Sequence, residues 1–316
     1  MKPSILLTGK IPSSVVATLE EIGNLDHFRR DGVDLMPHDE LVARVAGKQA
    51  LVSMITDAVS RDVIEAGTDL KIIANAAVGY NNIDVAAARQ RGIIVTNTPG
   101  VLIDATADLT WALILGITRR IGEGERLVRR GEWKGWTFDF MLGAELKGKQ
   151  LGIVGYGGIG RAVAARGRAF GMRIAHASRT PKSDPDAEAM PLDRLLATSD
   201  VVSLHCPLTS ETRHLIDQPA LARMKRSAYL INTARGPVVD EKALAWALRM
   251  RLIAGAGLDV FEEEPKVNPE LLTLENVMLV PHLGSGTVET RTAMADLAAR
   301  NVAAVFAGQS PLTPVS

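Results

Sequence analysis

The stretch KQLGIVGYGGIGRAVA, residues 149–164, decides the fold. Its apolar run Leu151–Val154 predicts a buried strand, and the residues after the glycines predict a helix. Between them, Gly155, Gly157 and Gly160 have the spacing G-x-G-x-x-G. The first glycine permits a tight turn, the second lets a pyrophosphate approach the backbone, and the third lets helix and strand pack closely. The helix N-terminus then faces the anion. In this strand–turn–helix context the spacing predicts a dinucleotide-binding unit rather than a chance glycine cluster.

The residues after the second strand of such a unit select the cofactor. That strand usually ends in Asp or Glu, which binds the adenine ribose hydroxyls. At the corresponding place this chain has Ser178, Arg179 and Thr180, and no acid follows until Asp184. A carboxylate would repel a 2′-phosphate, whereas an arginine flanked by hydroxyls would bind it. The sequence therefore predicts a preference for NADP(H), with NAD(H) as a second cofactor. If Arg179 only stacks on the adenine, the preference is loose.

Short apolar runs alternate with helix-like segments along most of the chain, which predicts parallel sheets covered by helices on both faces. The alternation pauses at a long helix expected over 101–120, so the domain boundary is expected near residue 100. A final helix expected over 288–306 has no following strand and is expected to pack on the first domain. Other strands are expected at 4–9, 50–56, 69–79, 92–100, 172–178, 200–206, 228–234, 254–260 and 276–281, and other helices at 13–23 and 82–92.

Length and charge restrict the class of protein. The 316 residues suggest two domains, on a scale of roughly 100–200 residues per domain. Basic and acidic residues number 36 each, so nothing indicates a nucleic-acid partner, which usually needs a basic face. The arginine-rich run RRIGEGERLVRR, residues 119–130, is expected to be a solvated helix face.

The single cysteine, Cys206, cannot form an internal disulfide and suits a reducing cytosol. It ends the apolar run VVSLHCP and is expected to be a buried, inert thiol. The N-terminus has too short an apolar run for a signal peptide and lacks a cleavage site of small residues. The longest apolar run, near Trp111 to Ile117, is far shorter than the roughly 20 residues that span a bilayer. We therefore predict a cytoplasmic protein without membrane contact.

Three strand ends after the glycine-rich turn carry a charged or titratable residue. Arg235 follows the strand YLINTA, Glu264 closes the run FEEEP, and His282 follows VMLVP. In open α/β sheets, ligands bind outside the carboxyl ends of the strands, so these residues are expected to meet in one crevice beside the nicotinamide.

The chemistry of the three side chains fits one task. A hydride that reaches a carbonyl carbon leaves negative charge on the oxygen, and a histidine supplies the proton best near neutral pH. A carboxylate on the other ring nitrogen would hold the imidazolium. An arginine would bind the carboxylate of a 2-oxo acid and polarise its carbonyl. We therefore predict His282 as acid/base, Glu264 as its partner and Arg235 as the substrate anchor, with no metal ion.

Each of the three also has a plain structural interpretation. Glu262, Glu263 and Glu264 together are typical of a solvated acidic turn. His282 beside Pro281 could cap or pack, and other histidines of the chain also lie near strand ends. The three residues indicate a site only as a set, in order, after a cofactor fingerprint.

The motifs together resemble the D-isomer-specific 2-hydroxyacid dehydrogenases, and among them the glyoxylate/hydroxypyruvate reductases. The likeness covers nearly the whole chain. Family members carry a catalytic Arg, Glu and His in the last three motifs, at the positions of Arg235, Glu264 and His282. The motifs are AAVGYNNIDV (76–85), TPGVLIDATAD (98–108), GIVGYGGIGRAVA (152–164), INTARGPVVDEKAL (231–244), AGLDVFEEEP (256–265) and PHLGS (281–285).

The resemblance implies a fold of two doubly wound α/β domains with parallel sheets. A Rossmann cofactor domain, residues 100–285, would be inserted into a flavodoxin-like substrate-binding domain, residues 1–99 plus 286–316. The backbone amides of Val78 and Gly79 would bind the substrate carboxylate beside Arg235. Met54 would line the substrate pocket and limit bulky side chains.

The resemblance also implies the remaining cofactor contacts. Thr106 would approach the nicotinamide-side phosphates or ring, Thr233 and Ala234 the nicotinamide ribose, and Asp259 the carboxamide. The Ser-Arg-Thr run matches the members that use NADPH. Further contacts are expected from Gly158 and Ile159 in the glycine-rich turn, from Cys206 and Pro207 at a strand end, and from Gly284 in the last motif.

Members of the family are usually homodimers joined through the cofactor domains. In hydroxypyruvate-reducing members a tryptophan of the partner subunit reaches the active site. GEWKGW, residues 131–136, matches that region, with Trp136 as the better candidate. A hydrophobic dimer contact is the alternative role for its tryptophans.

The leading hypothesis is the reduction of a small 2-oxo acid, with glyoxylate and hydroxypyruvate first, to the D-2-hydroxy acid by NAD(P)H. The same chemistry on a bulkier acid, such as 2-ketogluconate or an aryl pyruvate, needs a wider pocket. A phosphonate-oxidising enzyme would use the same fold on an inorganic substrate. A nucleotide-sensing transcriptional co-regulator is the alternative from another class, but this chain lacks the long disordered tails that such proteins carry.

Overall fold

The computed structural model describes residues 2–29, 35–180 and 182–315. It divides the chain into two compact units, residues 1–102 with 287–316, and residues 103–286. Each unit contains one parallel sheet covered by helices, as the alternation of strands and helices predicts. Among the described residues, no helix is long and apolar enough to cross a membrane.

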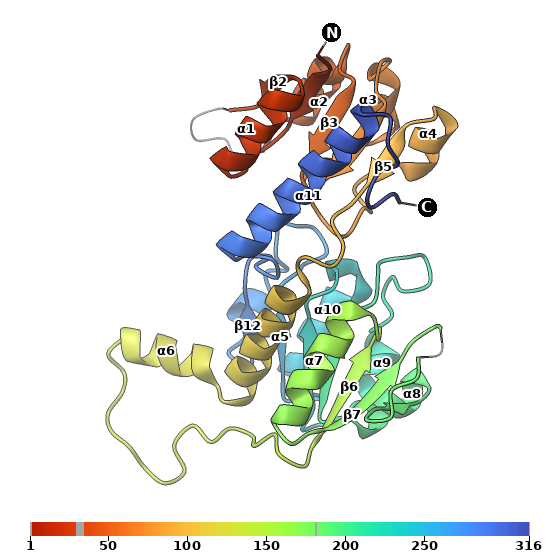
Figure 1. Cartoon of the computed structure of the whole chain (residues 1–316). Coiled ribbons are helices and arrows are strands. Elements are labelled where there is room, and N and C mark those ends of the chain that lie inside the picture. The colour runs from red at the N-terminus through yellow and green to blue at the C-terminus, as the bar shows by residue number, and fades with distance from the viewer. Residues whose placement is uncertain (1, 30–34, 181, 316) are drawn as a thin grey trace. The chain divides into compact units, whose positions relative to one another are not determined.

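The first unit, coloured red to orange with the blue helix α11 in Figure 1, has a five-stranded parallel sheet in the order β2-β1-β3-β4-β5. This is the strand order of flavodoxin-like domains. The strands are β1 (Ser4–Leu7), β2 (Asn24–His27), β3 (Ala50–Ser53), β4 (Ile72–Asn75) and β5 (Ile94–Thr96). The helices are α1 (Ser13–Ile22), α2 (His38–Val45), α3 (Arg61–Ala66), α4 (Val85–Gln90) and α11 (Val288–Phe306).

Successive side chains of a strand point to opposite faces of its sheet, and both faces of the first sheet are buried. Ile5 and Leu7 of β1 pack with apolar residues of α1 and α11. Leu6, between them, packs with apolar residues of α2, α3 and α4. Helix α11 therefore completes the core of the first unit, although it follows the second unit in the sequence.

The second unit has a seven-stranded parallel sheet in the order β12-β11-β10-β9-β6-β7-β8. Read from β8, this is the Rossmann order with β12 added at the far edge. The strands are β6 (Gln150–Val154), β7 (Arg173–Ala177), β8 (Glu188–Ala189), β9 (Val201–Leu204), β10 (Tyr229–Asn232), β11 (Gly255–Leu258) and β12 (Val277–Leu279). The helices are α5 (Ile103–Thr118), α6 (Ile121–Arg129), α7 (Gly158–Ala169), α8 (Leu192–Thr198), α9 (Gln218–Arg223) and α10 (Glu241–Arg249), with the 3-10 turns η1 (Gly236–Val238) and η2 (Leu271–Thr273).

Helices α5 and α7 cover one face of the second sheet, and α8, α9 and α10 cover the other. Trp111 of α5 is buried, and its indole nitrogen donates to the carbonyl of Val163 at 3.0 Å. Its ring stacks on Phe170, with the ring centroids 4.5 Å apart. These contacts fix α5 against α7, the helix that follows the glycine-rich turn.

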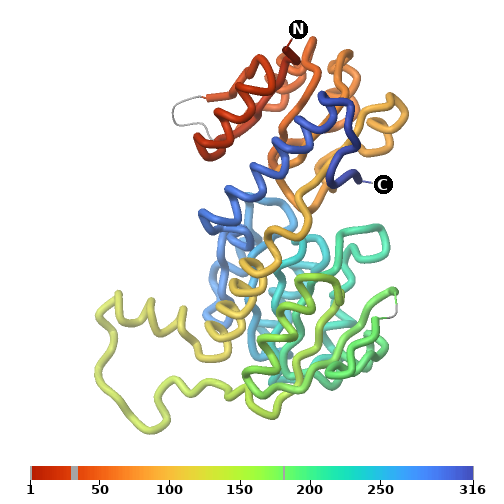
Figure 2. Tube along the Cα trace, viewed as in Figure 1, coloured from red at the N-terminus to blue at the C-terminus, as the bar shows by residue number. Residues whose placement is uncertain are grey.

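The single helix expected over 101–120 is wrong in its extent. Helix α5 ends at Thr118, and α6 starts at Ile121 after Arg120, whose φ of 56° is left-handed. A left-handed residue cannot continue an α-helix, so the chain changes direction there. Figure 2 shows that the segment after α6, residues 130–148, runs as a long loop away from the second sheet before it returns to β6.

Candidate active site

The glycine-rich turn lies where the strand order of the second sheet reverses, between β6 and β9. Gly155 has a φ of +94°, and its amide donates to the carbonyl of Ala177 at 2.9 Å. A Cβ atom on Gly155 would lie 2.6 Å from the amide nitrogen of Cys206 and from the carbonyl carbon of His205. Only glycine therefore fits, because the turn presses β6 against the end of β9.

The other two glycines of the fingerprint have opposite surroundings. A Cβ on Gly160 would lie 2.3 Å from the carbonyl oxygen of Gly155, so glycine is needed for α7 to pack on the turn. A Cβ on Gly157 would meet no atom within 4 Å. Open space therefore lies in front of Gly157, beside the N-terminus of α7. The pyrophosphate of a dinucleotide fits this place by charge and by space.

The strand end after β9 holds the single thiol. Cys206 is 9 % exposed, and burial raises its pKa to about 11. It is therefore an inert thiol, as the sequence predicts, and not a nucleophile. His205 beside it is bonded through Nε2 to Ser203 at 2.8 Å, and burial lowers its pKa to about 3.

The Ser-Arg-Thr run follows β7 at the surface. Arg179 is 80 % exposed in its side chain and forms an ion pair with Glu211 at 3.4 Å, also exposed. Ser178 donates its hydroxyl to the carbonyl of Thr180 at 2.9 Å. Because exposed ion pairs contribute little, Arg179 can exchange Glu211 for another anion. Asp184, the first acid after the run, accepts a hydrogen bond from the Tyr156 hydroxyl at 2.5 Å.

Arg235 lies in the loop that follows β10, and its backbone is held by Asn232. The side-chain amide of Asn232 donates to the carbonyl of Arg235 at 3.0 Å, and its side-chain oxygen accepts from the amide of Ala234 at 3.0 Å. A Cβ on the next residue, Gly236, would lie 1.8 Å from the carbonyl oxygen of Phe261. Glycine at this position therefore lets the loop after β10 lie against the loop after β11.

Glu264 and His282, from the loops after β11 and β12, form a hydrogen-bonded pair. The Nδ1 atom of His282 lies 2.7 Å from Oε2 of Glu264, and Oε1 accepts from the amide of Phe261 at 3.0 Å. The amide of His282 donates to the carbonyl of Asp259 at 2.9 Å, and its φ of 53° is left-handed. Both ends of the pair are therefore fixed by backbone contacts.

The charge of Arg235 interacts with the charge of Glu264. Burial alone would raise the pKa of Glu264, but the hydrogen bond and charge of His282, together with Arg235, bring that pKa below its ordinary value. Burial lowers the pKa of Arg235, and the charge of Glu264 opposes that shift. The structure thus brings together the three residues that the sequence singles out, with the Glu264 carboxylate near both the guanidinium of Arg235 and the imidazole of His282.

Asp259 and Gly284 lie beside the pair, and Gly284 also lies close to Thr106. The carboxylate of Asp259 accepts from the amides of Leu283 and of Gly284, the latter at 2.9 Å. Burial raises the pKa of Asp259, and these two hydrogen bonds oppose that shift. A Cβ on Gly284 would lie 3.6 Å from the hydroxyl of Thr106. Three expected cofactor residues from distant parts of the sequence therefore meet at one place.

Thr233 and Ala234, between β10 and Arg235, are both buried. The Thr233 hydroxyl lies 2.9 Å from the hydroxyl of Thr110, one turn after Thr106 on α5. This contact fixes the Thr233 side chain against α5.

In the first unit, the expected substrate residues follow β3 and β4. The amide of Met54 donates to the Asp57 carboxylate at 2.6 Å. The carbonyl of Val78 accepts from the side-chain amide of Asn97 at 2.7 Å, and that of Gly79 accepts from Asn75 at 2.9 Å. All three are therefore held at the carboxyl end of the sheet by buried or half-buried polar side chains.

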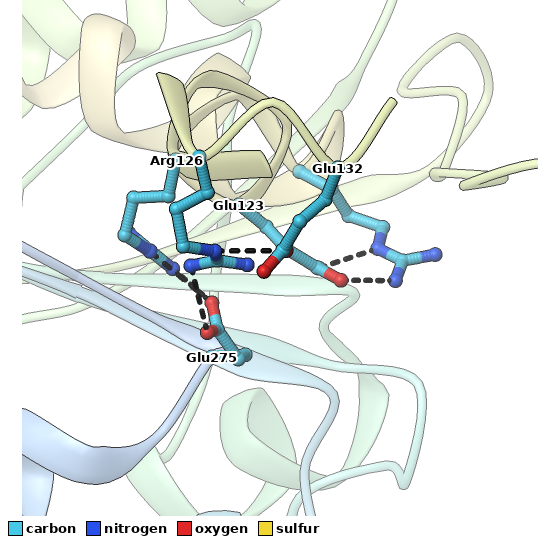
Figure 3. A network of polar contacts seen from close by, with 6 residues as sticks. Glu123, Arg126, Glu132 and Glu275 are labelled. Atoms are coloured by element: carbon cyan, nitrogen blue, oxygen red, sulfur yellow. Dashed lines mark hydrogen bonds and ion pairs between the residues drawn. The ribbon is translucent and has the colours of Figure 1, made fainter. Parts of the chain in front are cut away.

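The arginine-rich run forms α6, none of whose residues is buried, as expected for a solvated helix. Figure 3 shows Arg126 of α6 in an ion pair with Glu275, which precedes β12. Arg130 pairs with Glu132 at 2.8 Å. Trp136 lies further along, in the loop after α6, and 76 % of it is exposed. Ion pairs rather than a packed core therefore hold α6.

Comparison with known proteins shows which family carries this glycine-rich turn together with these residues at the strand ends. Residues 111–284 match the sequence profile described as "D-isomer specific 2-hydroxyacid dehydrogenase, NAD binding domain". The chain belongs to the D-isomer-specific 2-hydroxyacid dehydrogenase family. This confirms the resemblance seen in the motifs and makes the protein an oxidoreductase with a nicotinamide-cofactor domain in its second unit.

Relatives of this dehydrogenase match over almost its full length. It is 49 % identical to a protein named glyoxylate reductase from Thermococcus litoralis, over 98 % of this chain and 96 % of that protein. A crystal structure of a protein from Thermus thermophilus matches with a TM-score of 0.93 and 44 % identity, over 99 % of this chain and 100 % of that chain. A crystal structure described as an NADPH-dependent glyoxylate/hydroxypyruvate reductase from Sinorhizobium meliloti, in complex with NADP and malonate, has a TM-score of 0.91 and 36 % identity, over 100 % of this chain and 97 % of that chain.

Some residues that shape the dehydrogenase site were not singled out from the sequence. Asn232 fixes the backbone on both sides of Arg235, and Gly236 permits the close approach to Phe261. Both lie in the motif INTARGPVVDEKAL, so the signal was present as an Asn and a Gly that flank a candidate arginine. Asn75 and Asn97 carry no such signal, because their partners are the backbone carbonyls of Gly79 and Val78, which no side-chain pattern marks.

Proposed function

We propose that this dehydrogenase reduces a small 2-oxo acid, with glyoxylate and hydroxypyruvate first, to the D-2-hydroxy acid. The observation that supports this most is the 2.7 Å contact between His282 Nδ1 and Glu264 Oε2, with Arg235 on the neighbouring strand end. Residues 103–286 would bind the cofactor, and residues 1–102 with 287–316 would bind the substrate.

When bound, a reduced nicotinamide supplies a hydride to the carbonyl carbon of the substrate. His282 gives a proton from Nε2 to the carbonyl oxygen, since Nδ1 faces Glu264. Glu264 holds the imidazole in orientation and stabilises its positive charge. Arg235 binds the substrate carboxylate through its guanidinium and withdraws electron density from the carbonyl. In the first unit, the amides of Val78 and Gly79 are proposed as donors to a substrate carboxylate.

We propose NADPH as the preferred cofactor. Arg179 is exposed and forms an ion pair with the surface residue Glu211, so a 2′-phosphate can replace that partner. The hydroxyls of Ser178 and Thr180 flank it. Asp184, the first carboxylate after the run, is engaged by Tyr156 and lies 3.6 Å from Arg168. Both observations favour a phosphate over a free ribose hydroxyl at this end of the cofactor.

We also propose a homodimer formed through the second unit. Helix α6 and the loop after it expose a run of large apolar side chains, a surface that isolated soluble chains rarely leave uncovered. A second copy of the chain would cover it, and Trp136 would then lie near the partner's active site. The exposed residues are Ile121, Val128, Trp133, Trp136, Phe138, Phe140 and Leu142. A free buried thiol at Cys206 fits a reducing cytoplasm.

Turnover of the purified protein with a matrix of substrates and cofactors tests the proposal. Loss of NADPH absorbance would be followed with glyoxylate, hydroxypyruvate, phenylpyruvate and 2-ketogluconate, and each measurement repeated with NADH. With NADPH, we expect kcat/KM for each of the two small acids to exceed kcat/KM for each bulky acid by about tenfold or more. If only the bulky acids were turned over, the assignment of a small 2-oxo acid as substrate would be wrong. If turnover occurred only with NADH, the proposed preference for NADPH would be wrong.

A further inference from the structure

Three consecutive carbonyl groups after β4 are all bound by the protein. The amide of Thr98 donates to the carbonyl of Ala77 at 2.9 Å. The side chain of Asn97 donates to the carbonyl of Val78 at 2.7 Å, and that of Asn75 to the carbonyl of Gly79 at 2.9 Å. Each of the three carbonyl groups of this loop therefore has a hydrogen-bond donor within the protein.

This arrangement decides where the neighbouring amides point. In a trans peptide the C=O and the next N–H lie on opposite sides of the chain. Because the carbonyls of residues 77–79 face the protein, the N–H groups of Val78, Gly79 and Tyr80 face away from those partners. Across residues 2–29, 35–180 and 182–315, nothing accepts a hydrogen bond from these three N–H groups. Neighbouring backbone N–H groups that lack an acceptor within the protein are available to donate to an anion.

The two asparagines are themselves fixed. Asn75 is 1 % exposed, and its oxygen accepts from the Ser53 hydroxyl at 3.1 Å. The backbone of Asn97 is bound on both sides to Thr313, whose hydroxyl donates to the Asn97 carbonyl at 2.6 Å. Turning the Asn75 side chain away would break its buried contact with Ser53, and the bonds to Thr313 fix the backbone from which Asn97 reaches Val78. The loop is therefore held in one orientation by contacts within the protein.

We propose that Asn97 and Asn75 are positioning residues that aim the N–H groups of Val78, Gly79 and Tyr80 at the substrate carboxylate. The proposal rests on the function proposed above, which assigns two of these amides to the substrate, and adds Tyr80 as a third donor. The ligand class is a small carboxylate of the 2-oxo acid type. Charge-assisted hydrogen bonds from preoriented amides bind such an anion without an ordering cost.

The variant Asn97→Ala tests the proposal, because Asn97 is only half-buried and the variant should fold. KM for glyoxylate should rise by about tenfold or more. The kcat and the KM for NADPH should stay near wild type, since the chemistry and the cofactor unit are untouched. The matched control is Asn276→Ala in the second unit, whose side chain holds the carbonyls of Leu248 and Ala254. The control should lose a comparable amount of stability without a change in KM for glyoxylate.

A binding measurement separates this proposal from the proposed function. Oxamate, a carboxylate that is not reduced, is titrated calorimetrically into wild type, Asn97→Ala and Asn276→Ala protein with NADPH present. The dissociation constant should weaken by about the same tenfold factor in Asn97→Ala alone. Equal oxamate affinity in all three proteins, or no oxamate binding by wild type, would overturn the positioning role. Failure of wild type to reduce any 2-oxo acid, with oxamate binding still weakened in Asn97→Ala, would overturn the function and leave the anion site.

Discussion

The Nδ1 atom of His282 lies 2.7 Å from Oε2 of Glu264, and the backbone holds both residues. An ionised carboxylate can only accept, so Nδ1 donates and Nε2 is the nitrogen that can exchange a proton with a substrate. The contact joins the ends of two neighbouring strands, β11 and β12. It therefore gives the histidine one orientation relative to the sheet.

Replacement of His282 by Ala should lower kcat by about 10²–10⁴-fold, because the proton donor is lost. The dissociation constant for NADPH should change little, since His282 is not among the residues expected to bind the cofactor. Steady-state kinetics and a fluorescence titration measure the two quantities. The variant Glu264→Gln, which keeps the shape but not the charge, should have a smaller loss of kcat. A His282→Ala enzyme with wild-type turnover would remove the acid/base role.

Acid should weaken the Glu264 contribution to stability. The folded protein holds the pKa of Glu264 below its ordinary value of 4.5, so between the two values the unfolded chain binds the proton and stability rises with pH. The Tm difference between wild type and Glu264→Gln should be fully present above the ordinary value. It should shrink as the pH falls through the lower, folded value. A difference that stays constant down to the lowest pH would show that the charge of Glu264 is not stabilised by its neighbours.

The change Arg235→Lys keeps a positive charge but removes the planar fork that binds a carboxylate through two parallel hydrogen bonds. KM for the 2-oxo acid should rise and kcat should fall, with kcat/KM lower by about 10- to 100-fold. The matched control is Arg249→Lys, at a surface ion pair with Glu270 where the arginine is 52 % exposed. Its kinetics should match wild type. Near wild-type values for Arg235→Lys as well would exclude the anchor role.

Cofactor preference should follow residue 179. In the variant Arg179→Asp a carboxylate would repel the 2′-phosphate, so the ratio of kcat/KM for NADPH to that for NADH should fall by about tenfold or more. Arg194→Asp is the control, because Arg194 is also an exposed arginine in an ion pair, with Glu188 at 3.2 Å. An unchanged ratio in Arg179→Asp would show that Arg179 does not bind the phosphate.

Substitutions at two glycines of the turn should affect different properties, one the stability of the protein and the other its affinity for NADPH. Gly160→Ala places a Cβ 2.3 Å from the carbonyl of Gly155, so Tm should fall by about 2–10 °C. Gly157→Ala meets no atom within 4 Å, so Tm should stay near wild type while NADPH binds more weakly. Thermal denaturation and NADPH titration distinguish the two. Full NADPH affinity in Gly157→Ala would place the pyrophosphate elsewhere.

Much of this arrangement is predictable from the sequence because it depends on local patterns. Apolar runs mark the strands that are buried on both faces, and the ends of β10, β11 and β12 follow directly from those runs. The glycine spacing marks the turn after β6. Parallel order then places Arg235, Glu264 and His282 at one edge of the sheet.

Other features depend on contacts that no local pattern carries. The edge strand β2, with sequence NLDH, has no fully buried residue and so lacks an apolar run. The break at Arg120 has no proline to mark it and is visible in the left-handed backbone of that residue. The roles of Asn75 and Asn97 depend on carbonyl groups that the fold brings to them. Hydrogen bonds from a side chain to a backbone carbonyl leave no periodicity in the sequence.

Deuterium transfer tests the central claim most directly. Wild-type protein is incubated with hydroxypyruvate and NADPH that carries deuterium at the reactive carbon of the nicotinamide, and the glycerate formed is analysed by mass spectrometry and chiral chromatography. We predict D-glycerate with one deuterium on carbon 2 when the label is on one of the two faces of the nicotinamide, and unlabelled product when it is on the other. Unlabelled product from both forms, L-glycerate, or no glycerate at all would contradict the account.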